Sequence, residues 1–138
     1  MRSTMRRRSL SSVEESYRGR HVRVFRLDRE RVRALLAEKA SALLAARPDA
    51  IEVRLFGSLA RGDAAPGSDA DLWVLLRDDA LPFLERGVDL SRFFEGVGIG
   101  CDLLAYTEAE WAEMRREQRR LVEVVEREGL VLASRRPS

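Results

Sequence analysis

The sequence of 138 residues predicts a single α/β (α+β) domain in which helices pack on a small mixed sheet. Short apolar runs rich in β-branched or aromatic residues, which are typical of strands, lie at 51–56, 72–76 and 101–106. Longer segments with apolar residues at helical spacing surround them. The composition is 45% hydrophobic and 35% charged, as expected for a globular domain with its own core and a charged surface.

The first helix is predicted over 28–46. Asp28 is a residue type that caps helices, and apolar residues then recur on one face up to Leu44. Pro48 ends the helix because proline cannot continue the hydrogen-bond ladder. Apolar and polar residues alternate before this helix, at 21–27, which could form a short edge strand or a lead-in. We expect residues 1–20 to be a flexible basic tail and 21–134 to be the domain.

The remaining elements follow in order along the chain. Asp79 and Pro82 predict the start of an apolar helix that is interrupted near Gly87, and the third strand at 101–106 comes next. Thr107 and Glu110 form a capping-box pattern. This pattern predicts one last helix that ends at Gly129, followed by a short strand at 130–134.

The chemistry is concentrated in residues 57–71, GSLARGDAAPGSDAD. Gly57 follows the first strand and allows a ligand to approach the backbone. Ser58 is a suitable cap for a helical turn, and the N–H groups at the start of such a turn favour phosphate. We therefore expect Gly57 and Ser58 to bind phosphate, although Ser58 could be a plain cap.

Asp69 and Asp71 precede the apolar residues of the second strand. Since side chains alternate along a strand, both carboxylates should point the same way, with Cα atoms about 6.5–7 Å apart. Such a pair repels unless a cation lies between the two groups, and Mg²⁺ prefers carboxylate and phosphate oxygens. The alternative is that neither residue binds a metal, and that Asp69 stabilises a turn while Asp71 lies at the edge of the strand. Together with Gly57 and Ser58, the pair points to a metal-bound nucleoside triphosphate.

The order Gly-Ser, ten residues, Asp-x-Asp resembles the signature of the DNA polymerase β-like nucleotidyltransferases, and in detail the minimal nucleotidyltransferase (MNT) family. That family includes antitoxins paired with HEPN-domain toxins. The resemblance covers about residues 28–133 and implies the polymerase β-like core. It also implies a third carboxylate on a later strand, for which Asp102 is the candidate, as a metal ligand or as a base for the attacking hydroxyl.

The activity implied by this resemblance is Mg²⁺-dependent transfer of a nucleotide monophosphate, AMP from ATP, to a hydroxyl acceptor. Asp69, Asp71 and Asp102 would be the catalytic and metal-binding residues. After residue 107 the chain has room for little beyond one helix, so we expect another molecule to present the acceptor. The resemblance implies a tyrosine on a HEPN toxin, with this chain acting as its antitoxin. The alternative is a non-catalytic protein of the same fold that binds nucleotide or neutralises its partner by covering it.

Arg61 lies three residues after Ser58, so a helical turn places both on one side. It is a candidate nucleotide-binding residue that could contact phosphate. It could also pair with Asp63 or with Glu52.

Charge is unevenly distributed along the chain. Residues 1–36 hold eleven arginines and four acidic residues, while the net charge of the whole chain is only +2. Such an arm could bind nucleic acid or an acidic partner, but its arginines are not interleaved with a series of aromatic residues that could stack on bases. One cysteine, Cys101, excludes an internal disulfide, and a single histidine does not favour zinc. No apolar run approaches a membrane span, and we expect a cytoplasmic protein in which an oligomer is possible.

Overall fold

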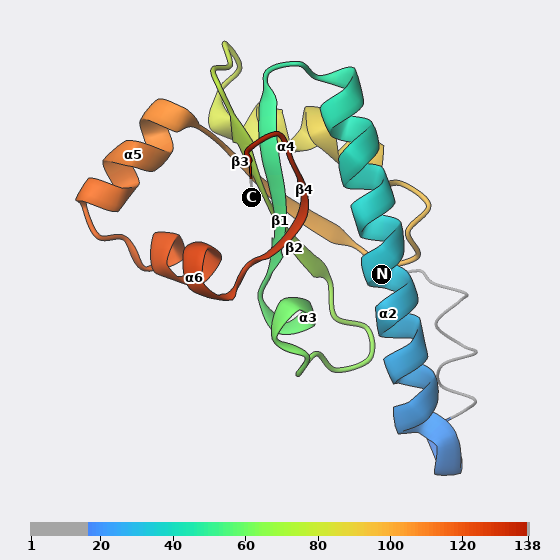
Figure 1. The fold of residues 1–138 in the computed structure, drawn as a ribbon. Coiled ribbons are helices and arrows are strands. Elements are labelled where there is room, and N and C mark those ends of the chain that lie inside the picture. Colours follow the sequence, from blue (N-terminus) through green and yellow to red (C-terminus); the bar gives the residue numbers. More distant parts are fainter. Residues whose placement is uncertain (1–16, 138) are drawn as a thin grey trace.

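The computed structural model describes residues 17–137, with side chains from Arg29 onward (Figure 1). The prediction of a flexible tail at 1–20 falls largely on residues 1–16, which lie outside the described residues. The elements confirm the predicted fold class, because a small mixed sheet is packed by helices on both faces.

The sheet has four strands in the order β3-β2-β1-β4. β1 pairs antiparallel with both β2 and β4, while β2 pairs parallel with β3. All four lie at the predicted positions within two residues: β1 (Ala50–Phe56), β2 (Ala70–Leu76), β3 (Cys101–Thr107) and β4 (Leu130–Ser134). The parallel pairing of β2 and β3 brings the beginnings of both strands to the same end of the sheet.

One face of the sheet is covered by α2 (Tyr17–Ala46), α4 (Phe83–Ser91) and the short 3₁₀ helix η1 (Arg92–Phe94). Leu36 and Leu43 of α2 pack with Val74 and Leu90 in the core on this side. The opposite face is covered by α5 (Glu108–Arg116) and α6 (Arg120–Glu128), which lie away from α2 in Figure 1.

The second core, under α5 and α6, is aromatic at its centre. Trp73 and Trp111 have ring centroids 5.0 Å apart, and Met114 and Val125 pack around them. Trp111 Nε1 donates to Glu126 Oε2 at 3.1 Å, which joins α5 to α6. This face of β2 also carries Asp71, two residues before Trp73, so the aromatic core forms one wall beside that carboxylate.

The prediction of one last helix from Thr107 to Gly129 is wrong. The chain breaks between α5 and α6, where Gln118 has φ 56°. An unbroken helix over 108–128 would be about 31 Å long, whereas a seven-residue strand spans only about 23 Å. By folding back, two short helices bring both Trp111 and Val125 onto the same face of the sheet. The capping box of Thr107 and Glu110 is confirmed.

The edge strand considered for 21–27 is also wrong, because α2 begins at Tyr17 and passes through this segment. The predicted start at Asp28 was therefore eleven residues late. Each residue added to an existing helix gains a backbone hydrogen bond, whereas an isolated strand has no partner for its backbone groups. The alternation of apolar and polar residues at 21–27 is too short to favour a strand over this gain in helical hydrogen bonds.

α4 is continuous through Gly87, so the interruption predicted there is wrong. A Cβ at Gly87 would lie 2.9 Å from the carbonyl oxygen of Leu103, which shows that the glycine lets α4 approach β3 closely. Pro82 is the N-cap of α4, as the proline signal predicted. Asp79 lies in the preceding turn, where its carboxylate accepts the N–H of Leu81 at 2.8 Å.

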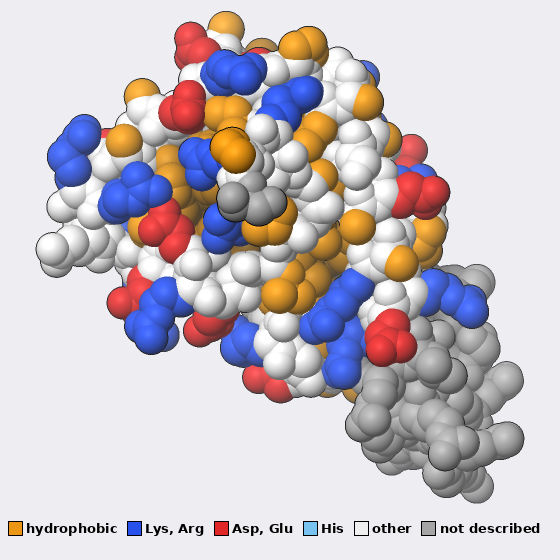
Figure 2. Space-filling view, viewed as in Figure 1, with side chains coloured by type: hydrophobic (Ala, Val, Ile, Leu, Met, Phe, Trp, Pro, Cys, Tyr) orange, Lys and Arg blue, Asp and Glu red, His pale blue; other side chains and the backbone are white. Residues whose placement is uncertain are grey.

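Figure 2 shows that arginine and acidic side chains are interspersed over the face in view, with hydrophobic side chains toward its middle. Such mixing gives this face no large patch of positive charge of the kind that binds nucleic acid. In the part of the chain that the structure describes, no helix combines the length and apolar character needed to cross a membrane.

Candidate active site

The turn after β1 is built around Gly57, whose φ of 80° and ψ of −157° suit glycine alone. The chain enters the one-turn helix α3 (Ser58–Arg61) directly and leaves it through Gly62, which has a left-handed conformation. The N-cap is Gly57, and Ser58 is already the first helical residue, without a side-chain capping bond. The prediction of Ser58 as the cap is therefore wrong, because the positive φ of Gly57 turns the chain one residue earlier.

Asp71 lies directly against this turn. A Cβ at Gly57 would lie 2.3 Å from Asp71 Oδ2, which is far inside any permitted contact. The register of β1 and β2 explains the approach, since Phe56 is the Cα partner of Asp71. The predicted phosphate turn and the predicted metal-binding carboxylate are thus brought together by the hairpin.

The parallel pairing of β2 and β3 supplies a second carboxylate. Asp71 and Asp102 are Cα partners in register, so their side chains leave the sheet on the same face. Asp69 comes just before β2 rather than within it. Its Oδ1 would lie 2.7 Å from a Cβ at Gly100, the residue before β3. All three predicted carboxylates therefore lie at the same end of these two strands.

Burial and mutual repulsion both act on the ionisable groups of this cluster. Burial raises the pKa of Asp71 above its usual range, and the charges of Asp102 and Asp69 raise it further, while Arg61 opposes the shift. The neighbouring Cys101 thiol has a pKa raised to about 12 by burial and by Asp69 and Asp102. Cys101 is therefore a protonated, half-buried thiol and not a nucleophile.

The chemistry of the donor set fits a divalent cation. The carboxylates of Asp69, Asp71 and Asp102 have no hydrogen-bond or ion-pair partner among residues 29–137, so their oxygens are free to bind a ligand. Over the same residues, no group of three or more His, Cys, Asp or Glu side chains is placed so that it could hold a metal ion, so the three aspartates do not form a ready-made set of metal ligands. Mg²⁺ needs only one or two carboxylates from the protein where substrate phosphates supply the other oxygens.

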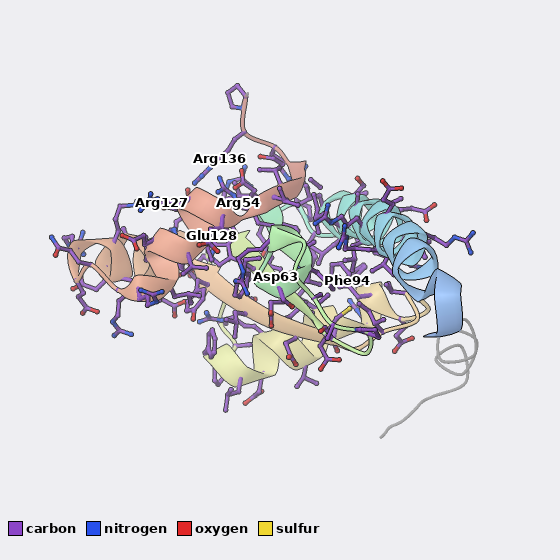
Figure 3. The ribbon with its side chains drawn as sticks, turned by 90° about the horizontal axis from the view of Figure 1, so that it is seen from below. Arg54, Asp63, Phe94, Arg127, Glu128 and Arg136 are labelled. Carbon is purple, nitrogen blue, oxygen red and sulfur yellow. The ribbon has the colours of Figure 1, made fainter. Side chains whose placement is uncertain are left out.

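Arg61 stands at the exit of α3 and is 45% exposed. Its Nε donates to Asp63 Oδ2 at 3.2 Å, and its Nη1 lies 3.7 Å from Glu128 Oε1 at the end of α6. Figure 3 labels Asp63 and Glu128, the two acidic residues that Arg61 contacts. The predicted pair with Asp63 is confirmed. Glu52 is not a partner of Arg61, because it is buried and paired with Arg54.

Two features of the site were missed from the sequence. Glu128 reaches Arg61 from α6, a contact between positions far apart in the chain that no local pattern indicates. Gly100 makes room for Asp69 where its Cβ would collide. A glycine directly before a strand that carries a candidate site carboxylate is a usable sequence signal for such a close approach.

Comparison with known proteins agrees with this geometry. The model of the nucleotidyltransferase domain family matches residues 36–132, well over half of the chain. A putative nucleotidyltransferase from Sulfolobus solfataricus superposes with a TM-score of 0.57 at 23% identity, over 78% of this chain and 85% of that one. At this identity the likeness shows the fold alone. No curated protein matches the sequence.

Two further solved structures are similar. One is a toxin-antitoxin with AMP-PNP, with a TM-score of 0.49 and 25% identity over 71% of this chain and 73% of that one. The other is a mutant of the toxin-antitoxin MntA-HpeT, with a TM-score of 0.47 and 22% identity over 71% and 72%. These TM-scores are too low to carry an argument. The match over residues 36–132, which contains the Gly-Ser turn and all three carboxylates, is decisive. The chain belongs to the nucleotidyltransferase domain family, as its resemblance to the minimal nucleotidyltransferases implied.

Proposed function

We propose that this protein is a Mg²⁺-dependent nucleotidyltransferase that moves AMP from ATP to a hydroxyl group on a partner protein. The observation that carries the proposal is the pairing of Asp71 with Asp102 across parallel strands, with Asp71 also against the Gly57 turn. This arrangement puts unpaired carboxylates beside a turn that a phosphate can approach. This placement at one end of the sheet supports a site for a metal-bound triphosphate.

Each residue has a distinct role in this proposal. Asp69 and Asp71 hold the metal ions, and Gly57 and Ser58 bind the β- and γ-phosphates through backbone groups at the start of α3. Arg61 exchanges its pairing with Asp63 for a phosphate oxygen. Bound Mg²⁺ would neutralise charge on the phosphates and on the attacking and leaving oxygens.

Asp102 acts on the acceptor. Its carboxylate takes the proton of the attacking hydroxyl; alternatively, it would be a ligand of a bound Mg²⁺, which would make this proton easier to remove. The acceptor oxygen forms a bond to the α-phosphorus while the bond from that phosphorus to the bridging oxygen breaks. Pyrophosphate leaves, and AMP remains on the acceptor as a phosphodiester.

The acceptor is proposed to be a tyrosine on a HEPN toxin, with this protein as its antitoxin. After Thr107 the described chain forms only α5, α6 and β4, all of which contact the sheet. In this proposal these elements complete the sheet and cover its aromatic face, and another molecule presents the acceptor. An acceptor presented by a partner protein is consistent with this arrangement. A cytoplasmic location would give the protein access to ATP.

The test is incubation with ATP labelled at the α-phosphate, Mg²⁺ and a candidate HEPN protein. We expect label on that partner with the wild-type chain and no label with Asp71→Asn. A complex that forms and neutralises the toxin without any transfer of label would overturn the enzymatic proposal in favour of neutralisation by binding. Transfer of label to a small molecule in the absence of the partner would overturn the choice of acceptor.

A further inference from the structure

The one-turn helix α3 is too short to satisfy all of its own carbonyl groups. The carbonyls of Gly57 and Ser58 accept backbone N–H groups from residues 60–63. The helix then ends, so no later turn supplies donors for the carbonyls of Leu59 and Ala60. Their donors have to come from another part of the chain.

Arg33 of α2 supplies these donors. Its Nε donates to the Leu59 carbonyl at 3.2 Å, and its Nη2 donates to the carbonyls of both Leu59 and Ala60, to the second at 3.2 Å. Arg29, one helical turn earlier in α2, donates from Nη1 to the Gly62 carbonyl at 3.0 Å. We call Arg29 and Arg33 the arginine clamp. Two cations thus hold the C-terminal end of α3, the end at which the helix dipole favours positive charge.

α2 can reach α3 because it runs past the end of the sheet that carries this turn (Figure 1). Its 30 residues are about 45 Å long, whereas a seven-residue strand spans only about 23 Å. Leu36 and Leu43 of α2 pack in the core, and the arginine clamp lies before them, where the helix passes α3. The overshoot of α2 is therefore used to hold the turn after β1.

The other end of α3 is open. The N–H groups of Ser58 and Leu59 have no hydrogen-bond partner among residues 29–137. They directly follow Gly57, which lies against Asp71. The turn is thus held by its carbonyl groups from α2, while its first N–H groups are left for a ligand. This is the end of the turn at which the proposed function puts the phosphates.

We propose that Arg33, assisted by Arg29, is a positioning residue that fixes the Gly57 turn for a bound triphosphate. This inference rests on the proposed function, because the ligand of the turn is the triphosphate of ATP. Glycines at both ends of α3, Gly57 and Gly62, would leave an unsupported turn free to adopt other backbone conformations. The arginine clamp removes this freedom before the ligand arrives, so less order has to be gained on binding. Arg33 acts through the main chain and does not itself contact the nucleotide.

The first measurement needs no nucleotide. Amide hydrogen exchange, followed by NMR, reports on the N–H groups of Gly62 and Asp63, which are bonded to the Ser58 carbonyl. In Arg33→Ala these two groups should exchange about tenfold faster than in the wild type, because the turn opens more often. The N–H groups inside β1 and β2 should keep their wild-type exchange rates.

The second measurement is the Kd of ATP with Mg²⁺, determined by calorimetry on the full chain. We expect it to rise about tenfold in Arg33→Ala, which loses hydrogen bonds from a charged donor. Arg33→Lys keeps the positive charge, but its ammonium group does not reproduce the planar fork that holds two carbonyls. We therefore expect Arg33→Lys also to bind ATP more weakly than the wild type.

Two arginines provide matched controls. Arg31→Ala removes an exposed charge from another side of the same helical turn, so it tests the effect of charge alone. Arg135→Ala removes an arginine that likewise donates to main-chain carbonyls, but at the opposite end of β1. Both should keep the wild-type Kd and the wild-type exchange of the turn. Melting temperatures show how much stability each variant loses, and a comparable loss in Arg135→Ala without weaker binding would separate positioning from stability.

Unchanged ATP affinity in a folded Arg33→Ala variant would overturn the positioning role. Full recovery in Arg33→Lys, or an equal loss of affinity in Arg31→Ala, would also overturn it, because charge alone would then be responsible. Unchanged exchange of Gly62 and Asp63 in Arg33→Ala would show that the arginine clamp does not fix the turn. Absence of ATP binding by the wild type would instead contradict the proposed function, and the exchange rates would still decide whether the clamp holds the turn.

Discussion

Asp71 is packed so closely against Gly57 that no other residue fits at position 57. The space that a Cβ would need is taken by Asp71 Oδ2, at 2.3 Å. The glycine therefore serves the site twice, since it supplies the positive φ of the turn and leaves room for the carboxylate. The turn proposed to bind phosphate and the carboxylate proposed to bind metal are therefore in direct contact.

Replacing Gly57 by alanine should damage both the fold and nucleotide binding. Gly62→Ala is the matched control, because Gly62 also has a positive φ, of 88°, but a Cβ there would meet nothing within 4 Å. In Gly62→Ala we expect only the cost of holding alanine at a positive φ, which lowers the free energy of unfolding by about 1–2 kcal/mol. Gly57→Ala should lose more, and it should no longer bind ATP in calorimetry. Equal losses in the two variants would show that the contact with Asp71 is unimportant.

Asp71→Asn should stabilise the metal-free protein. Since the folded state raises the pKa of Asp71, the protonated form is favoured there. The stability this gives is fully present below the unfolded pKa of about 3.9 and is lost as pH rises through the folded pKa. At pH 7 the ionised group is destabilised by its partial burial and by repulsion from Asp102 and Asp69, and asparagine removes both effects.

Thermal melts in EDTA at pH 7 should therefore give a higher melting temperature for Asp71→Asn than for the wild type, and the difference should disappear at low pH. Glu95→Gln, an exposed change with no partner among the described residues, is the control and should melt like the wild type. A lower melting temperature for Asp71→Asn at pH 7 would contradict the repulsive cluster.

The strands were predictable because each combines an apolar run with a clear boundary. Residues 51–56 and 72–76 end at Gly57 and Arg77, and they recur in β1 and β2 almost unchanged. The three candidate carboxylates stand out in the sequence by residue type and spacing, and their role in a site stays a prediction. Their meeting could not be predicted, because it depends on which strands pair: only the parallel register of β2 with β3 brings Asp102 beside Asp71.

The errors occurred where tertiary packing overrides local signals. Gln118 has no turn-forming neighbours, yet the chain breaks there because both halves of the helical segment must reach one sheet face. Gly87 looked like a helix breaker and is instead a point of close packing on Leu103. Asp63 could be predicted as a partner of Arg61 because it is two residues away in the sequence. Glu128 could not, because only the folded structure brings α6 close to Arg61.

Arg86 and Glu110 should contribute measurably to stability, because they tie α4 to α5. Arg86 is only 5% exposed, and its Nη1 and Nη2 donate to Glu110 at 2.6 and 3.0 Å. Glu110→Gln would leave this buried guanidinium without its counter-charge, so we expect a loss of about 1–3 kcal/mol in urea unfolding. Glu108→Gln, an exposed change in the same helical turn, should cost little.

The loss should depend on pH. The hydrogen bonds from Arg86 lower the pKa of Glu110 in the folded state. This contribution is therefore present above the unfolded pKa of about 4.3, and it is lost as pH falls through the folded value. The wild type and Glu110→Gln should differ at pH 7 and converge in strong acid. A difference that persists in strong acid would mean that packing, not charge, is responsible.

Nucleotide binding should need both the divalent ion and the aspartate pair. In Asp69→Ala/Asp71→Ala the cation would lose two oxygen ligands, and we expect no Mg²⁺-dependent affinity for ATP in calorimetry. Asp78→Ala/Glu95→Ala removes two exposed acidic groups outside the site and should bind as the wild type does. Unchanged ATP affinity in a folded Asp69→Ala/Asp71→Ala variant would contradict the assignment of these two residues as metal ligands.

Asp102 should matter for transfer more than for binding. It sits on β3 beside Asp71, on the side away from the Gly57 turn, where an acceptor hydroxyl can approach. Stabilising the attacking oxygen is needed only as the transition state forms, so Asp102→Asn should keep nearly normal ATP affinity. Transfer to the partner should fall by about 100-fold or more, the usual contribution of a positioned acid or base. The measurement is single-turnover transfer of α-labelled AMP with the partner in excess, and Glu108→Gln is the control. Full transfer by Asp102→Asn would make this carboxylate a bystander, whereas loss of ATP affinity equal to that of Asp69→Ala/Asp71→Ala would place it in the nucleotide-binding half of the site.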